Sequence, residues 1–419
     1  MMNKILITAL FIFIPLFLKF PAFRLAESYV AIRLEDFLIL FSVLFFSVQI
    51  FKNYKFVLSK PTAKAILLYL LIGVASVVSA IFVTESAATG TAVLHWLRRV
   101  EYFSLFFVGL IYLKNSVDED NFGYFIKLLL LTNFFIFIYG FGQRYLEFPV
   151  ITTQNEEYSK GVALRWVPGA HINSTFAGHY DLASYLVLTI PIFIGLFFVL
   201  TDKLSKIILG LSIAAGFWLL AVAVSRISIV AFIVASVITL FLLKKYKAIL
   251  LVVAVSVVFF GFSPDLQVRY KRIIDVAKQK ISSVVVVKAQ EGGNVNEDRS
   301  TSIRLNVEWP RAIRAFTKNP ILGTGYSSIT LATDNDYLRA LGETGILGLS
   351  AFLFIFYTIY QKFKDRLKFD ASMKSVFTAG FIGSTIGILI IAIFIDIFEA
   401  SKFASMYWLF AGLIISDNG

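Results

Sequence analysis

Arginine and carboxylate side chains gather in one polar stretch, residues 264–343, of a chain that is otherwise strongly apolar. Arg304, Glu308 and Arg311 are spaced i, i+4 and i+7, so a helix would present two guanidiniums on one face with a carboxylate between them. Such a face is either a solvated row of ion pairs or a binding site for an anion. The chemistry open to these residues is charge-assisted binding of a phosphate or a similar group.

Arg226 is a second candidate for an anion site, because it is the only charged residue between positions 208 and 243. Arginine in contact with lipid is costly, so this side chain either reaches a wet interior cavity or snorkels to the membrane surface. Arg98 and Arg99 lie in another apolar segment, where Arg98 can pair with Glu101 and Arg99 has no local partner. We expect arginines from separate segments to hold one anion, such as a membrane-anchored diphosphate.

A general base is expected in the run Asp334-Asn335-Asp336-Tyr337. We expect Asp334 to cap a short helix that begins at Asn335, and a helix N-terminus lowers the pKa of a carboxyl group. The anion that can accept a proton is thereby favoured, although it is a weaker base. Asp336 and His179, which opens another apolar segment, are the competing candidates.

Segments long enough to cross a bilayer must position these residues. Of 419 residues, 58% are hydrophobic and 16% are charged, against roughly 25% charged in an ordinary soluble domain. Nearly uncharged stretches recur at the length that crosses a hydrocarbon core of ~30 Å as a helix, which satisfies its own backbone hydrogen bonds in lipid. We predict an all-α polytopic membrane protein with about twelve transmembrane helices. The expected spans are 4–20, 36–52, 64–84, 92–113, 123–143, 179–201, 204–224, 226–243, 247–263, 345–362, 373–395 and 402–416.

Lysine-rich connections give the expected orientation, because basic loops stay in the cytoplasm. The basic connections are 53–64, 203–206, 244–247 and 362–374, which fall on one side of a twelve-helix topology. The chain then divides into 1–263 with nine transmembrane helices, 264–344 as one long extracytoplasmic helical loop, and 345–419 with three more helices. A second outer loop is expected at about 144–178.

Two amphipathic helices are expected inside the long loop. The first covers residues 265–288, and its apolar stripe fits a helix lying on the bilayer surface. The second begins after Ser300, a suitable N-cap, and runs to about Thr317. Pro310 interrupts this second helix and should kink it.

The composition argues against several other classes of site. The net charge of +12 is explained mainly by the basic connections, and no basic cluster on a soluble face indicates a nucleic-acid partner. Cysteine is absent, which excludes disulfides and thiolate metal sites. The three histidines are too far apart for a metal-ligand spacing to be read. We therefore expect no nucleic acid, no metal and no cofactor.

The motifs around the long loop resemble the O-antigen ligase and O-antigen polymerase superfamily. The resemblance rests on Arg304-x4-Trp309, Asn319-Pro320, Gly323-x-Gly325 and Asp334-Asn335-x-Tyr337-Leu338-x2-Leu341-x-Glu343-x-Gly345-x2-Gly348. Ser225-Arg226 resembles the family's Ser-Arg step at the outer end of a span. The upstream element is similar as well: Arg165, then Ser174-Thr175-Phe176 with serine in the place of glycine, then Leu182-Ala183.

The resemblance implies a metal-independent glycosyltransferase of the bacterial inner (cytoplasmic) membrane. Such enzymes move a glycan from an undecaprenyl diphosphate carrier to a glycolipid (lipid A-core) or glycan acceptor at the outer face. Arginines hold the diphosphate, and in ligases a histidine followed by asparagine is the candidate base. Asp334 stands in the place of that histidine here, so the expected catalytic residues are Asp334, Arg226 and Arg304. The expected substrate-binding residues are Arg98, Arg99, Arg165, His179, Arg311, Asn335 and Tyr337.

Two other functions fit a chain of this kind. A transporter has the same span count, and some bicarbonate-associated membrane proteins are similar to this superfamily. A transporter should carry charged residues and broken helices at the bilayer midplane, whereas here the charges gather at the outer end and in the long loop. A non-catalytic scaffold or flippase partner is the other alternative, which the missing histidine favours. Nothing in the residues separates a ligase from a polymerase.

Overall fold

The computed structural model describes residues 2–24, 31–116, 120–151, 164–262, 267, 303–329, 332–364 and 370–416. Within these residues the chain is almost entirely helical, as its apolar segments predict. A short antiparallel hairpin departs from the all-α prediction: β1 (Pro21–Arg24) pairs with β2 (Ala31–Arg33). The amphipathic helix predicted at 265–288 and the Ser300 cap lie outside the described residues.

Each predicted span coincides with a helix in the described residues. These helices are α1 (Met2–Leu16), α2 (Leu34–Lys52), α4 (Pro61–Phe82), α5 (Thr89–Lys114), α6 (Asn121–Tyr145), α8 (His179–Val199), α9 (Lys203–Ala223), α10 (Arg226–Leu242), α11 (Tyr246–Gly261), α15 (Asp336–Phe363), α16 (Met373–Ile391) and α17 (Ser401–Ser416). The short helix α3 (Tyr54–Ser59) joins α2 to α4. Seven helices among the described residues, α2, α4, α6, α8, α9, α15 and α16, are long and apolar enough to cross a membrane. They support a multi-pass membrane protein, while the full count of twelve stays a prediction.

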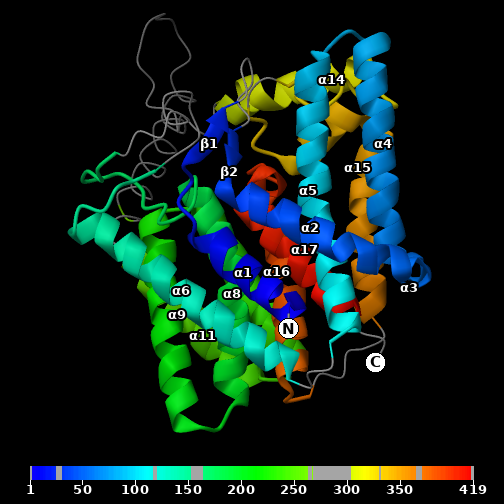
Figure 1. Ribbon diagram of the computed structural model, residues 1–419. Coiled ribbons are helices and arrows are strands. Elements are labelled where there is room, and N and C mark those ends of the chain that lie inside the picture. The colour runs from blue at the N-terminus through cyan, green and yellow to red at the C-terminus, as the bar shows by residue number, and fades with distance from the viewer. Residues whose placement is uncertain are drawn as a thin grey trace, which may run out of the picture.

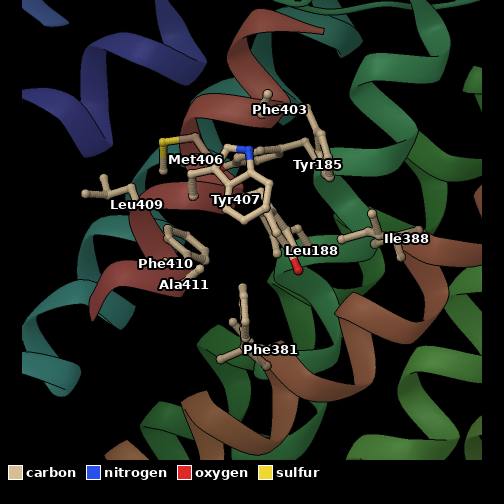
Figure 2. Close-up of a cluster of buried hydrophobic side chains, with 14 of the residues drawn as sticks. Tyr185, Leu188, Phe381, Ile388, Phe403, Met406, Tyr407, Leu409, Phe410 and Ala411 are labelled. Carbon is tan, nitrogen blue, oxygen red and sulfur yellow. The ribbon is translucent and has the colours of Figure 1, made fainter. Parts of the chain in front are cut away.

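The bundle is organised around α17, whose residues are all buried from Ser401 to Ser416. Figure 2 shows how aromatic and aliphatic side chains of α8, α16 and α17 meet there. The rings of Phe381 and Tyr407 have their centroids 5.2 Å apart, and Tyr185 from α8 is fully buried in the same cluster. These large rings bury enough apolar surface to hold three helices together.

Glycines let neighbouring helices approach backbone to backbone. A Cβ atom added to Gly412 of α17 would lie 2.0 Å from the carbonyl oxygen of Phe106 in α5, and one added to Gly109 would lie 2.6 Å from the carbonyl oxygen of Leu409. Gly383 of α16 stands equally close to α10. Small residues at helix contacts are typical of packing in membranes, where close approach replaces the hydrophobic driving force.

The described part of the long loop lies across one end of the bundle (Figure 1). It consists of a π-helical turn, η1 (Arg304–Glu308), continued by α14 (Trp309–Lys318), which packs against α15. The predicted interruption at Pro310 is therefore present, and it takes the form of a widened turn just before the proline. Proline has no N–H for the i−4 carbonyl and its ring crowds the preceding turn, so a wider turn relieves both problems.

Helix α15 is broken near its start by Gly345, which has φ +66° and ψ −168°. The residues before the break, from Asp336 on, form a short helix that packs beneath the loop, and the residues after it form the long apolar helix. Gly323, also with positive φ, sits directly against this break, because a Cβ atom there would lie 2.4 Å from the backbone of Glu343. The Asn319–Gly325 turn and the α15 break thus form one interlocked unit under α14.

Candidate functional site

The centre of the candidate site is an ion pair between η1 and the segment that precedes α15. Arg304 donates through Nε to Asp334 Oδ2 at 2.9 Å and places its Nη2 2.7 Å from the same oxygen. The side chains are 12% and 27% exposed, so the pair is shielded but open to a reactant. Charge-assisted bonds of this length are among the stronger polar contacts in proteins. A guanidinium and a carboxylate that the sequence only suggested as separate candidates thus lie in direct contact.

The helix cap at this site is Asn335, which corrects the prediction that Asp334 fills that role. Asn335 Oδ1 accepts a hydrogen bond from the backbone N–H of Leu338 at 2.9 Å, and the helix begins at Asp336. Asp334 instead adopts a left-handed backbone with φ +48°, which turns its side chain toward Arg304. Left-handed backbone is uncommon outside glycine, although Asp and Asn tolerate it best.

The pKa of Asp334 is raised, which is opposite to the prediction from a helix N-terminus. Burial of the carboxyl group is the largest cause, the charge of Asp396 adds to it, and contact with Arg304 opposes it. Desolvation penalises the charged form more than one ion pair restores it. The group is therefore a stronger base than an ordinary aspartate, and a proton transferred to it is held more tightly.

Glu308 and Arg311 do not form the ladder of ion pairs that their spacing allows. In the described residues Glu308 Oε2 is buried without a hydrogen-bond partner, and so is Arg311 Nη1. The Arg304 guanidinium is directed instead to Asp334. Burial, followed by the charge of Asp334, raises the pKa of Glu308 to about 7. A second carboxyl group with a raised pKa thus stands on the same element as Arg304.

The start of α8 approaches the same ion pair. The side chain of Tyr180 hydrogen-bonds with Arg304, and the neighbouring His179 ring lies 4.0 Å, centroid to centroid, from the Tyr180 ring. His179 also stacks on His171 at 4.1 Å. The predicted site residue His179 is therefore brought next to a residue that touches Arg304. Tyr180 itself was missed by the sequence reasoning.

Arg98 and Arg99 are brought toward the site as members of buried ion pairs. Arg98 Nη1 lies 3.2 Å from Glu101, as its spacing predicts, and 3.1 Å from Asp36. Arg99, which has no partner in its own segment, pairs with Glu399 and lies 3.9 Å from Glu343. These contacts satisfy the guanidiniums within the protein, and their part in substrate binding stays a prediction.

Arg339 links this group to the segment around Asp334. Its guanidinium lies 3.3 Å from Glu343 and 2.8 Å from Asp396. Asp396 in turn accepts hydrogen bonds from the backbone N–H groups that flank Asp334. Charged contacts therefore run from Arg99 through Glu343 and Arg339 to Asp396, and backbone hydrogen bonds join Asp396 to the residues that flank Asp334.

Asp396 lies at the site but was not predicted from the sequence, although the sequence around it is informative. It is the only charged residue between Lys374 and Glu399, in a stretch that is otherwise apolar. The same reasoning that singled out Arg226 as a lone charge beside a span would have singled out Asp396. It was missed because it lies outside the motifs that indicated the family.

Three other predicted residues occupy different surroundings. Arg165 is 76% exposed and pairs with Glu147 at 2.9 Å, away from the buried network. Tyr337 donates its hydroxyl to the carbonyl oxygen of Leu389 at 2.8 Å, so it ties α15 to α16. Arg226 opens α10 and is partly buried. Its convergence with Arg304 on one anion stays a prediction, as does the binding role of Arg165.

The site has the chemistry of proton transfer and anion binding. Within the described residues, no group of three or more histidine, aspartate or glutamate side chains is arranged to hold a metal ion. The groups available to a reactant are guanidiniums, a tyrosine hydroxyl and two carboxyl groups with raised pKa.

Residues 211–353 match the protein-family model described as O-antigen ligase. The matched stretch contains Arg226, Arg304 and Asp334 and ends inside α15. No curated protein matches the sequence.

Proposed function

Residues 211–353 match the O-antigen ligase family, and from that premise we propose that the protein transfers a glycan from a membrane-anchored diphosphate carrier to an acceptor hydroxyl. The donor is an undecaprenyl diphosphate-linked glycan, and the acceptor is lipid A-core or a second glycan chain. The reaction takes place at the outer face of the inner membrane, on the side of the long loop.

The observation that supports this proposal is the contact between Arg304 and Asp334. It places a proton acceptor within 2.9 Å of a cation, in a shielded position under α14. Glycan transfer needs both a proton acceptor and a cation, because the acceptor oxygen loses a proton as the diphosphate leaves with its negative charge. The pair also lies inside the stretch that matches the family.

The proposed reaction is a direct displacement at the anomeric carbon of the donor. The acceptor hydroxyl oxygen attacks this carbon while Asp334 takes the hydroxyl proton, and the bond between the carbon and the diphosphate oxygen breaks. The electron pair leaves with the diphosphate, whose charge is stabilised by Arg304 together with Arg311 and Arg226. Arg304 thereby passes from Asp334, which has become neutral, to the new anion.

The Arg304→Lys and Asp334→Asn variants test this mechanism. Asp334→Asn should lower the turnover of lipid-linked glycan on the order of 100-fold, the usual contribution of a general base. Arg304→Lys should restore little of the activity lost in Arg304→Ala, because lysine lacks the two-pronged geometry that holds a diphosphate. Turnover is measured with purified protein, lipid-linked donor and acceptor in liposomes.

Two further variants make the result specific. Arg144→Ala removes another partly buried arginine, one that stacks on Trp166, and should leave turnover unchanged. Full activity in Asp334→Asn together with lost activity in His179→Ala would move the base to α8 and overturn the assignment.

A transporter is the second candidate, and one observation favours it. Helix α15 is broken at Gly345 beside the buried pairs of Arg99, Glu343 and Arg339, and broken helices next to buried charges are typical of transport sites. Solute uptake by liposomes that contain the protein but no glycan donor would support this candidate over the enzyme.

A further inference from the structure

Two aspartates bind the backbone of each other's segment where α15 begins and α16 ends. Asp396 Oδ1 accepts from the N–H of Asn335 at 2.9 Å, and its Oδ2 accepts from the N–H of Thr333 at 2.8 Å. Asp336 Oδ2 accepts from the N–H of Ile397 at 2.9 Å. A backbone hydrogen bond from Asp336 N–H to the carbonyl oxygen of Ala392, also 2.9 Å, completes the arrangement. We call this reciprocal arrangement the aspartate clasp.

The aspartate clasp holds the two residues on either side of Asp334. The N–H groups of Thr333 and Asn335 both point to one carboxylate, so the backbone between them is bound at two places. Asp334 itself has φ +48°, a conformation that an L-residue keeps only when its surroundings impose it. The side chain that results from this backbone reaches Arg304.

We propose that Asp396 is a positioning residue that holds Asp334 in contact with Arg304, and so sets the geometry of the proton acceptor in the reaction proposed above. It touches neither of the reacting side chains and acts through the backbone of residues 333–335. The inference rests on the proposed function, and it concerns a residue beyond the stretch that matches the family.

The contacts of Asp396 are suited to this role rather than to proton transfer. Both of its oxygens are occupied by backbone N–H groups, and Arg339 binds Oδ2 at 2.8 Å. Arg339 and these N–H groups lower the pKa of Asp396 despite its burial. A carboxylate that stays charged keeps its backbone partners in place over the working pH range.

Two substitutions separate geometry from charge. Asp396→Glu keeps the charge and the pairing with Arg339, but it moves the oxygens by one methylene from the N–H groups that they bind. Asp396→Asn keeps the shape but removes the charge and one acceptor. Both should lower kcat by about 10- to 100-fold, the usual cost of a misplacement of ~1 Å, while KM for the lipid-linked donor stays near that of the wild type.

The pH profile gives a readout that a merely structural role would not move. The charged groups that face Asp334 are Arg304 and Glu308 from η1, Arg339 from α15, and Asp396. Contact with Arg304 lowers the pKa of Asp334, so losing that contact shifts the acid limb of the kcat profile to higher pH. Removing the charge of Asp396 shifts the acid limb to lower pH, because that charge raises the pKa of Asp334.

The direction of the shift decides the outcome. An acid limb moved to higher pH in Asp396→Glu, which keeps the charge, supports positioning. A limb moved to lower pH in Asp396→Asn, with Asp396→Glu unchanged, means that Asp396 acts only through its charge and overturns the proposal. Wild-type kcat in Asp396→Glu also overturns it, and this variant decides alone if Asp396→Asn does not fold.

A matched control and the wild type keep this test apart from that of the proposed function. Asp120→Asn changes another aspartate that accepts a backbone N–H, from Gly123 at 3.0 Å, and should leave both kcat and the pH profile unchanged. Absence of glycan transfer by the wild type would overturn the proposed function. Normal transfer by the wild type and by both Asp396 variants would overturn the positioning role alone.

Discussion

The two carboxyl groups beside Arg304 differ in how their charge is balanced. Asp334 accepts two bonds from the guanidinium, whereas Glu308 keeps a buried oxygen without a partner in the described residues. Both contacts from Arg304 go to one oxygen of Asp334, a residue 30 positions away in the sequence. Glu308 avoids the free-energy cost of a buried, unpaired charge by keeping its proton.

The raised pKa of Glu308 predicts a pH-dependent stability. The folded protein holds this proton up to about pH 7, whereas the unfolded chain loses it near ~4.3. The stability that the protonated group allows is therefore fully present below the unfolded value and is lost as pH rises toward 7. Glu308→Gln cannot ionise, so its melting temperature should exceed that of the wild type by an amount that grows from pH 5 to pH 7 and then levels off.

Thermal melts in detergent over this pH range measure the difference. Glu147→Gln changes a carboxylate that is 73% exposed and should show no such trend. A constant difference between Glu308→Gln and the wild type across pH 5–8 would mean that Glu308 is already ionised at pH 5.

At the scale of elements, the break in α15 allows the first part of this helix to contact both the Asn319–Gly325 turn and the segment around Asp396. Gly345 allows the chain to turn so that the backbone of Glu343 faces the Asn319–Gly325 turn, and Gly325 N–H donates to Glu343 carbonyl oxygen at 2.8 Å. The short first part of α15 then presents Asn335 and Asp336 to the segment around Asp396. A straight α15 would move the site residues away from that segment.

The break predicts that Gly345→Ala will be strongly destabilising. At φ +66° and ψ −168° a residue with a side chain is strained by about 1–3 kcal/mol. The added Cβ would also lie 2.3 Å from the carbonyl oxygen of Ile321, which is backbone and cannot move aside cheaply. We expect a lower melting temperature and a lower yield of folded protein, measured by fluorescence size-exclusion chromatography.

Gly261→Ala is the matched control, because a Cβ atom at this position near the end of α11 would meet nothing within 4 Å. This variant should fold as well as the wild type. Equal yields for the two alanine variants would show that α15 does not need the break.

At the scale of the whole molecule, the described part of the long loop and the connection that contains α3 lie at opposite ends of the bundle. In Figure 1, α14 and the connection between α4 and α5 lie at one end, and α3 lies at the far end of α4. This arrangement suits a bilayer between them, with the candidate site near one surface. The side that faces the cytoplasm is predicted from the positions of the lysines.

Introduced cysteines test this orientation directly, because the chain has none of its own. Val167 and Tyr246 are 58% and 57% exposed and lie in connections predicted to face opposite sides. A membrane-impermeant maleimide added to intact spheroplasts should label Val167→Cys, and it should label Tyr246→Cys only after the membrane is opened. The reverse pattern would invert the topology, and labelling of both from outside would contradict the predicted span count.

The amino-acid sequence alone predicted the helical segments and the resemblance to the family. Long apolar runs predict helices wherever they occur, because in lipid the backbone must satisfy its own hydrogen bonds within each segment. The Arg304–Trp309 and Asp334–Gly348 motifs indicated the family that residues 211–353 match. Local signals also gave the pairing of Arg98 with Glu101 and the interruption before Pro310.

Only the tertiary structure decided which charges meet. Helix spacing allowed Arg304 either to pair with Glu308 or to help bind an anion, whereas in the structure Arg304 contacts Asp334, which precedes the helix on which α14 packs. The pKa of Asp334 follows from burial, which no local pattern reports. Asp396 reaches residues 333–335 from 61 positions away or more, because contacts between distant segments depend on how the helices pack against one another.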